Sequence, residues 1–231
     1  MSVFEDALKL ALTEANIPFD DALVSQCCAY FDSVVTVNEH LNLTRITDEA
    51  QAAKAHFADA MLLAKYIDLP QGCRVIDVGT GAGFPGVPLK LLRPDIDMTL
   101  LDAAGKKTDF IKSALSSLDV EASVVCGRAE ELARTKLRES FDVVASRAVA
   151  SLRMLLELCI PLLRTGGTLV AWKGETAQQE LDEAKHALSA LGCVLAGTRP
   201  IRPGALLMIT KQKPTPEKYP RRFAKIKSDP L

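Results

Sequence analysis

Residues 75–86 constrain the fold more than any other stretch of the chain. The run Val-Ile-Asp-Val at 75–78 leads directly into three alternating glycines, Gly79, Gly81 and Gly83. A short apolar run that ends in glycines is typical of a buried parallel strand followed by a tight turn. Glycine also lets a ligand approach the backbone, and Pro85 suits a helix start. The stretch predicts a strand, a glycine loop and a helix, as in nucleotide-type sites at strand ends.

The glycines fit two binding patterns. Gly81, Gly83 and Gly86 satisfy G-x-G-x-x-G, the dinucleotide fingerprint, which is weak evidence when it stands alone. Gly79, Gly81 and Gly83, preceded by Asp77, satisfy D-x-G-x-G-x-G, which resembles motif I of the S-adenosylmethionine-dependent methyltransferases. The dinucleotide loop starts its glycines directly at the strand end, whereas Gly81 stands two residues late. Position therefore favours the methyltransferase interpretation and leaves the dinucleotide enzyme as the rival.

Composition indicates an ordinary globular protein, with 48% apolar and 25% charged residues among 231. The first residues carry no basic, then apolar, targeting pattern, and no uncharged run approaches membrane-spanning length. The six cysteines show no C-x-x-C spacing and no paired histidines, which argues against a metal site or a disulfide framework. We expect a cytoplasmic protein without a bound metal.

Charge is distributed unevenly along the chain. Residues 1–70 carry 4 basic and 11 acidic side chains, whereas residues 211–231 carry 7 basic and 2 acidic ones. The basic tail is rich in proline and includes Lys218, Tyr219, Arg221 and Arg222. Basic side chains contact phosphates and aromatic rings stack on unpaired bases, so this segment predicts RNA binding. A solvated tail kept for solubility is the alternative.

Hydrophobic spacing predicts helices over residues 2–35 with a turn at 16–18. A capped helix follows the loop at 42–48 and runs through His56. Strands and helices then alternate, which is typical of an open parallel sheet. The expected strands are 74–78, 97–101, 122–126, 141–146 and 168–172, with 193–198 and 205–211 as an antiparallel edge hairpin. The expected helices are 106–118, a short one from 128, 152–163 and 178–191, and Gly166-Gly167 forms a turn.

These elements predict an α/β fold: a mostly parallel, doubly wound Rossmann-like sheet of the class I methyltransferase type. We expect a helical extension (1–70) packed on the core, the core itself (71–213) and a basic tail (214–231).

Two segments stand where strand ends would converge on a ligand. Asp102 ends the second strand, 23 positions after Gly79, and a carboxylate there can accept both hydroxyls of a ribose. Ala129 and Glu130 follow the third strand, where class I methyltransferases place the cofactor's adenine. An Asp that starts a loop and a helix-capping Glu are the plain structural alternatives.

Arg147 follows the fourth strand, at the place that faces the reacting methyl group in class I methyltransferases. The segment lacks the N-P-P-aromatic motif of enzymes that methylate exocyclic amines. Cys126 and Cys159 lack the Pro-Cys or Thr-Cys setting of enzymes that methylate pyrimidine carbon-5. A ring nitrogen with a free lone pair, such as guanine N7, needs neither device. Catalysis would then depend on alignment and on tolerance of a cationic product.

The chain as a whole resembles the bacterial 16S (small-subunit) ribosomal RNA guanine-N7 methyltransferases, also called glucose-inhibited division protein B. The resemblance rests on segments that follow the family order along nearly the whole chain. They are Asn-Leu-Thr at 42–44, His-Phe-Ala-Asp at 56–59, residues 77–86, Leu-Asp at 101–102 with Lys106-Lys107, Arg-Ala-Glu-Glu at 128–131, Ser-Arg-Ala-Val-Ala at 146–150, Lys173-Gly174 and Lys-Pro-Thr-Pro-Glu-Lys-Tyr-Pro-Arg at 213–221. The extreme tail departs from the family pattern, which leaves its detailed RNA contacts open.

The resemblance implies transfer of a methyl group from S-adenosyl-L-methionine to N7 of a specific guanine in small-subunit ribosomal RNA. The implied cofactor-binding residues are Asp77, Gly79, Gly81, Gly83, Phe84, Asp102, Ala103, Ala104, Ala129, Glu130 and Arg147. Arg147 is also the candidate catalytic residue, with no general base expected. Lys173 joins the four tail residues as an expected RNA contact.

We expect a monomer that acts on this RNA within the assembled subunit and binds neither DNA nor a membrane. The role of His56 stays open. A non-catalytic ribosome-assembly factor that retains the fold as a scaffold is the second rival.

Overall fold

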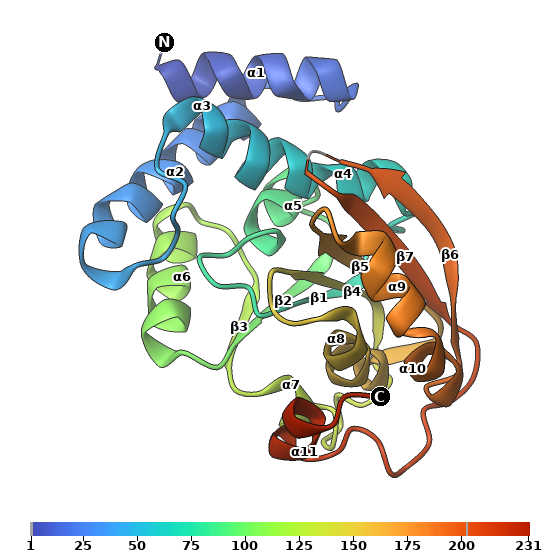
Figure 1. The fold of residues 1–231 in the computed structure, drawn as a ribbon. Coiled ribbons are helices and arrows are strands. Elements are labelled where there is room, and N and C mark those ends of the chain that lie inside the picture. Colours follow the sequence, from blue (N-terminus) through green and yellow to red (C-terminus); the bar gives the residue numbers. More distant parts are fainter. Residues whose placement is uncertain (1, 202) are drawn as a thin grey trace. The chain divides into compact units, whose positions relative to one another are not determined.

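The computed structural model describes residues 2–201 and 203–231. The strands form a seven-stranded sheet of order β3-β2-β1-β4-β5-β7-β6 (Figure 1). The chain divides into two compact units. The helical unit contains the chain up to Gly72 together with Thr80–Cys126, and the sheet unit contains Cys73–Gly79 together with Gly127–Leu231. The three segments predicted from the sequence follow other boundaries, and that division stays a prediction.

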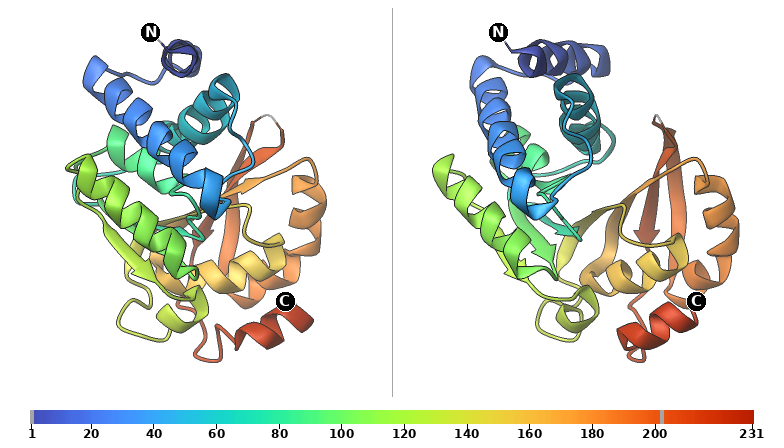
Figure 2. Two further views of the ribbon diagram at one scale, coloured as in Figure 1. Left: turned by 90° about the vertical axis from the view of Figure 1, so that its left-hand side faces the viewer. Right: turned by 60° about the vertical axis from the view of Figure 1, so that its left-hand side comes forward.

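The helical unit contains most of the helices. Its elements are α1 (Val3–Ala15), α2 (Asp21–Leu41), α3 (Glu49–Ala52), the π-helix η1 (Ala53–Ala58), α4 (Asp59–Tyr66), α5 (Gly86–Leu92), β2 (Asp97–Asp102), α6 (Gly105–Ser117) and β3 (Ser123–Cys126). Strands β2 and β3 pair in parallel, with Asp102 opposite Cys126. α1 packs on α2, α3 and η1, and α2 packs on α5 and α6 (Figure 2).

Side-chain caps fix where the N-terminal helices begin. Asp20 Oδ1 accepts a hydrogen bond from the backbone N–H of Leu23 at the start of α2, and Asp48 Oδ1 accepts one from Gln51 at the start of α3. Asn16 and Asn42 end α1 and α2 in the left-handed conformation, where a short polar side chain is tolerated. The predicted turn at 16–18 and the capped loop at 42–48 are therefore confirmed.

The sheet unit contains the parallel strands β1 (Arg74–Val78), β4 (Phe141–Arg147) and β5 (Leu163–Lys173), followed by the antiparallel strands β7 (Ala205–Lys211) and β6 (Cys193–Pro200). Its helical elements are α7 (Ala129–Leu132), α8 (Leu152–Cys159), the 3₁₀-helix η2 (Ile160–Leu162), α9 (Ala177–Glu183), α10 (Lys185–Ala190) and α11 (Phe223–Ser228). The fold class and the antiparallel edge hairpin predicted from the sequence are confirmed.

Two local predictions need correction, and one element was not predicted. The predicted helix 152–163 ends earlier, and β5 begins at Leu163; the pairing with β4 then skips residues 164–167, which contain the predicted glycine turn. The predicted helix 178–191 is divided at Ala184, whose backbone angles of φ −87° and ψ 2° interrupt it. The basic tail, for which no helix was predicted, contains α11. Within the described residues, no helix combines the length and the apolar character that crossing a membrane requires.

Candidate functional site

The glycine loop in the helical unit is held in shape by backbone hydrogen bonds. Thr80 N–H donates to the carbonyl of Leu101 at 3.0 Å, next to the end of β2. The N–H groups of Gly83 and Phe84 both donate to the carbonyl of Thr80, at 2.8 and 2.9 Å. Gly81 N–H donates to Asp102 Oδ2 at 2.9 Å. The structure therefore brings together two of the predicted cofactor residues, Gly81 and Asp102.

Asp102 also organises the loop that follows β2. Its second oxygen, Oδ1, accepts a hydrogen bond from Ala104 N–H at 2.9 Å. The carboxylate is half-buried, and Ala103 and Ala104 beside it are exposed. A carboxylate offers about four lone-pair sites, and these two contacts use two of them. Asp102 can therefore hold both loops and still accept hydrogen bonds from the hydroxyls of a bound ligand.

Tyr30 supports the glycine loop from α2. Its side chain is fully buried, and its hydroxyl donates to the carbonyl of Ala82 at 2.8 Å. Gly83 has φ +86°, and a Cβ added there would lie 2.2 Å from the Tyr30 hydroxyl oxygen. Glycine is thus required at 83 because the tyrosine occupies the side-chain space. This role of Tyr30 was not predicted from the sequence; an apolar ring with a polar tip on a buried helix face was the available signal.

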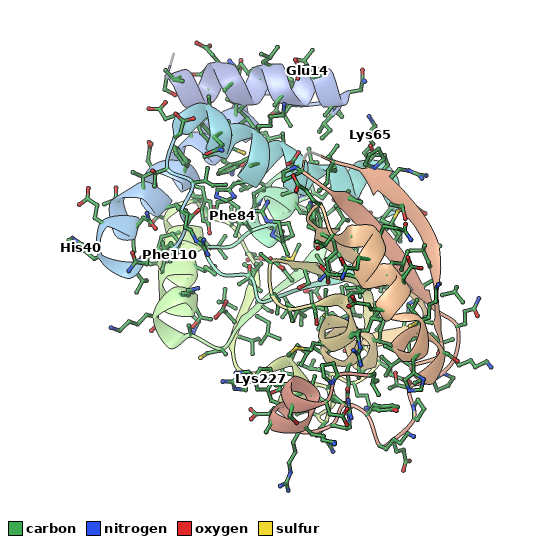
Figure 3. All side chains as sticks on the ribbon, viewed as in Figure 1. Glu14, His40, Lys65, Phe84, Phe110 and Lys227 are labelled. Atoms are coloured by element: carbon green, nitrogen blue, oxygen red, sulfur yellow. The ribbon has the colours of Figure 1, made fainter. Side chains whose placement is uncertain are left out.

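Phe84 packs into the helical unit, and Figure 3 shows its position among the surrounding side chains. Its ring stacks on His56, with centroids 4.5 Å apart and planes 9° apart, and meets the edges of Phe57 and Tyr30. The Nε2 atom of His56 lies 2.8 Å from Thr44 Oγ1. His56 belongs to η1, and single π-helical turns inside helices are frequent at functional sites. The predicted cofactor contact of Phe84 stays a prediction, and His56 gains a packing role.

In the sheet unit, the ends of β1 and β4 lie side by side. Asp77 is buried opposite Ala145 in the register of the two strands. The buried Ser146 hydroxyl donates to the carbonyl of Val78 at 2.9 Å. Burial, and then the charge of Asp77, raises the pKa of the Cys159 thiol. A thiol kept neutral is a poor nucleophile, in line with the expectation that Cys159 takes no part in catalysis.

The loop after β4 lies against Gly79. Arg147 is the last residue of β4 and is half-buried. Ala148 has φ +57°, an uncommon conformation for a residue other than glycine. Gly79 has φ +74°, and a Cβ added there would lie 2.3 Å from Val149 Cγ2. The predicted residues Gly79 and Arg147 thus come from two segments that meet through Val149.

Ala129 and Glu130 are the first two residues of α7, and both are buried. The preceding Arg128 is exposed, and its guanidinium lies 5.0 Å from the centre of the Phe223 ring on α11. The predicted adenine contact of Ala129 and Glu130 stays a prediction.

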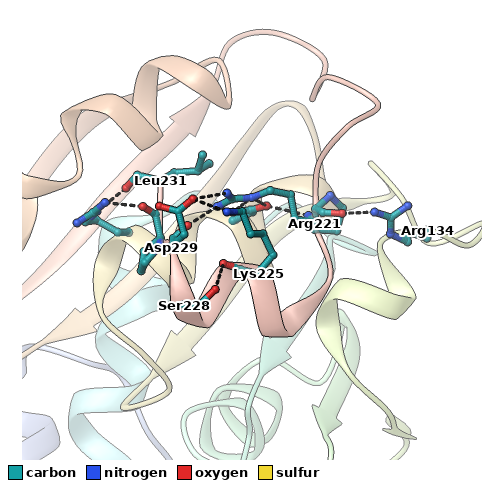
Figure 4. Close-up of polar contacts among 10 residues, drawn as sticks. Arg134, Arg221, Lys225, Ser228, Asp229 and Leu231 are labelled. Carbon is teal, nitrogen blue, oxygen red and sulfur yellow. Dashed lines mark hydrogen bonds and ion pairs between the residues drawn. The ribbon is translucent and has the colours of Figure 1, made fainter.

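The predicted RNA-binding residues fall into two groups. Lys173 is only 7% exposed, and its ammonium donates to Glu180. Arg221 donates to both oxygens of Glu157, a carboxylate with no exposure to solvent (Figure 4). Tyr219 is buried. The structure gives these three side chains internal roles, whereas Lys218 and Arg222 are exposed.

Arginines of the sheet unit hold the tail by its backbone carbonyls. Arg134 donates to Pro220, and Arg138 donates to Thr215 and Tyr219 at 2.8 Å each. Arg153 donates to the carbonyls of the last two residues, Pro230 and Leu231. The tail is therefore a packed segment of the sheet unit and contains α11.

Within the described part of the chain, no group of three or more His, Cys, Asp or Glu side chains is placed to bind a metal ion.

Comparison with known proteins places this geometry in context. A family model described as rRNA small subunit methyltransferase G matches residues 24–199. A protein named Ribosomal RNA small subunit methyltransferase G from Lactobacillus delbrueckii subsp. bulgaricus is 41% identical over 230 residues, covering 95% of this chain and 96% of the relative. A protein of the same name from Clostridium novyi is 38% identical and covers 99% of this chain and 98% of the relative.

Among solved structures, a SAM dependent methyltransferase from Aquifex aeolicus matches with a TM-score of 0.56 at 16% identity. The match covers 70% of this chain and 93% of that chain. At this identity the likeness establishes the fold, which is the one predicted from the sequence.

Proposed function

The chain belongs to the rRNA small subunit methyltransferase G family, and from this membership we propose that it transfers a methyl group from S-adenosyl-L-methionine to N7 of one guanine in 16S ribosomal RNA. The observation that carries the proposal is the pairing of Asp102 with the Gly81 N–H. It unites the glycine loop with a carboxylate at a strand end, as a nucleoside-containing cofactor requires.

The residues present fit this cofactor. In the helical unit, Asp102 keeps free lone pairs beside the exposed Ala103 and Ala104, where ribose hydroxyls and an adenine edge would bind. In the sheet unit, the proposed contacts are the backbone at Gly79, the start of α7 at Ala129 and Glu130, and Arg147. Asp77, Gly81, Gly83 and Phe84 complete the proposed set by shaping the loops. When bound, S-adenosylmethionine supplies a methyl group made electrophilic by its sulfonium.

Proton transfer is not required of this chain. Guanine N7 carries a lone pair in its ordinary neutral form, so no general base has to act before it attacks. The protein's part is to bind both reactants, orient N7 in line with the methyl group and exclude water. The proposed role of Arg147 is orientation at the methionine end and beside the incoming base.

Substrate contact is proposed for the exposed basic residues of the tail. Lys218 and Arg222 are the predicted RNA-binding residues that face solvent, and Lys225 and Lys227 on α11 are exposed as well. Tyr219, Arg221 and Lys173 are not assigned to this surface, because their side chains are occupied within the protein. The proposed setting is a cytoplasmic monomer that acts on the assembled small subunit.

The test incubates the purified protein with tritiated S-adenosylmethionine and small subunits lacking the modification, in parallel with naked ribosomal RNA. Borohydride and aniline then cleave the RNA at 7-methylguanosine. A single new cleavage site in the subunits is expected. Incorporation of tritium into the RNA without cleavage would support methyl transfer but refute the N7 assignment. Absence of label would favour a non-catalytic assembly factor.

The variant Asp102→Asn separates cofactor binding from folding. It preserves the size of the side chain but removes the charge, and one of the two backbone N–H partners then faces an amide NH₂. We expect titration calorimetry to show S-adenosylmethionine binding weakened by about tenfold or more, since a charge-assisted hydrogen bond is worth roughly 1.5–3 kcal/mol. Asp109→Asn, an exposed change on α6, is the matched control. Equal affinity in the two variants would refute the role of Asp102.

A further inference from the structure

Lys173 and Glu180 form a largely buried ion pair at the end of β5. The Lys173 ammonium donates to Glu180 Oε2 at 2.8 Å and to the backbone carbonyl of Ala150 at 2.6 Å. Lysine is almost never this deeply buried unless it is paired. The two contacts show what the pair holds in place: a carbonyl in the loop that follows β4.

The same carboxylate holds the other end of that loop. Glu180 Oε2 also accepts a hydrogen bond from the backbone N–H of Leu152 at 2.6 Å, in the first turn of α8. Ser151 occupies the N-cap position of α8 but makes no side-chain capping hydrogen bond. Glu180 therefore supplies the cap that α8 lacks, and one ion pair binds the loop through Ala150 and through Leu152.

The loop of residues 148–151, between the end of β4 and the start of α8, holds a conformation that needs such support. Ala148 has φ +57°, and a conformation of this kind persists only where the surroundings fix it. Val149 lies against the α-carbon of Gly79, with Cγ2 in the space a Cβ would fill. Arg147 precedes the loop and pairs in register with Trp172, the neighbour of Lys173. The ion pair thus lies one residue from the strand pairing that places Arg147.

We propose that Lys173 and Glu180 are positioning residues for methyl transfer, which hold residues 147–151 in the arrangement that the reaction uses. This inference rests on the proposed function and assigns the pair no contact with cofactor or RNA. Without the pair, Ala148 can leave its positive-φ conformation, and Val149 and Arg147 lose their fixed places. The reactants would then be misaligned in a protein that is still folded.

A second buried pair in the same unit provides a matched control. Lys211 is fully buried, and its ammonium donates to Glu139 at 2.6 Å and to the carbonyls of Ile160 and Leu163. Leu163 begins β5, whereas Lys173 ends it, so the two pairs have like chemistry at opposite ends of one strand. Burial raises the pKa of Glu139, but hydrogen bonds from Lys211 and the Thr215 N–H outweigh it and hold the pKa below its ordinary value of 4.5.

The experiment compares Lys173→Met with Lys211→Met in the methyl-transfer assay on small subunits. We measure kcat, KM for S-adenosylmethionine and KM for the subunit, and we follow urea unfolding of each variant. Lys173→Met is expected to lower kcat/KM about 100-fold, the size of loss that a displacement of roughly 1 Å produces. Lys211→Met is expected to lose stability with kcat/KM within a few-fold of the wild type.

A shared loss of stability with equal kinetic constants in the two variants would overturn the proposal. So would a rise confined to KM for the subunit, which would return Lys173 to the RNA-contact role. Methylation by the wild-type protein in the same assay keeps this outcome separate from failure of the proposed function, which would abolish activity in every sample.

Glu180 provides the second arm if Lys173→Met does not fold. Glu180→Gln retains an oxygen that can accept from Leu152 N–H and Lys173, so it is expected to keep most of the activity. Glu180→Ala removes the acceptor and is expected to reproduce the loss in kcat. Equal activity of the two Glu180 variants would contradict the positioning role.

Discussion

Substitution of Gly79 by alanine tests the contact between β1 and the loop after β4. Gly79 has φ +74°, and a side chain in the left-handed region costs about 1–2 kcal/mol. The added Cβ would lie 2.3 Å from Val149 Cγ2. Valine is stiff about its first side-chain torsion, so the contact is relieved only by moving the loop. Overpacking of this kind costs about 1–3 kcal/mol.

One opposing effect enters the expected total. The alanine restricts the unfolded chain and returns about 0.4–1 kcal/mol of stability. Gly79→Ala should therefore destabilise the protein by about 1–5 kcal/mol. Val149 is 39% exposed. Substitutions at surface sites usually change stability by no more than about 0.5 kcal/mol, so Val149→Ala alone should change it by no more than about 1 kcal/mol.

The double variant separates the steric part from the conformational part. Shortening Val149 removes Cγ2 and leaves its Cβ 3.5 Å from the new methyl group, an ordinary contact. Gly79→Ala/Val149→Ala should thus recover about 1–3 kcal/mol, the overpacking part of the loss. Urea unfolding followed by circular dichroism measures each midpoint, and a constant slope shows that stability alone has changed. Additive effects of the two substitutions would refute the contact.

Three other predictions use the same unfolding assay. Tyr30→Phe removes the donor to the Ala82 carbonyl, so it should cost about 1–3 kcal/mol; an unchanged midpoint would argue against this support of the glycine loop. Arg221→Met leaves the buried Glu157 carboxylate uncompensated and should cost about 3–5 kcal/mol, and Arg221→Met/Glu157→Leu should recover most of it; no recovery would contradict the pairing. Because the folded pKa of Glu139 is depressed, its contribution is complete above the ordinary value of 4.5 and is lost as the pH falls through the folded pKa. Stability of Glu139→Gln should accordingly fall less steeply below pH 4.5 than that of the wild type, and equal slopes would contradict this assignment.

The sheet was predictable from the sequence because its signals are local. The first strand has the predicted bounds, 74–78, because its largely apolar run ends directly at Gly79. The meeting of Gly81 and Asp102 was also within reach, because parallel strands end at one edge of a sheet. In both cases residue type and order along the chain carry the information.

The roles of the buried charges could not be predicted in this way. Lys173 and Arg221 carry the same charge as Lys218 and Arg222, and the sequence does not show which of them are buried. The partner of Arg221 lies 64 positions away, so only the folded chain reveals it. Tyr30, which lies 52 positions from the carbonyl it holds, was missed for the same reason. Local pattern identifies a cation but not its partner.

The hydrogen bonds that hold the tail have a consequence for the order in which the two units fold during synthesis. Arg153 on α8 donates to the carbonyls of Pro230 and Leu231, and Glu157 accepts hydrogen bonds from the Arg221 guanidinium. Synthesis proceeds from the N-terminus, so Glu157 is made 64 residues before Arg221. The helical unit, which ends at Cys126, can close while synthesis continues. The sheet unit closes later, because Arg153 and Glu157 contact residues that lie 64 to 78 positions further along the chain. Until Arg221 has been synthesised, the buried Glu157 carboxylate lacks the cation that compensates its charge, so the sheet unit folds after the helical unit.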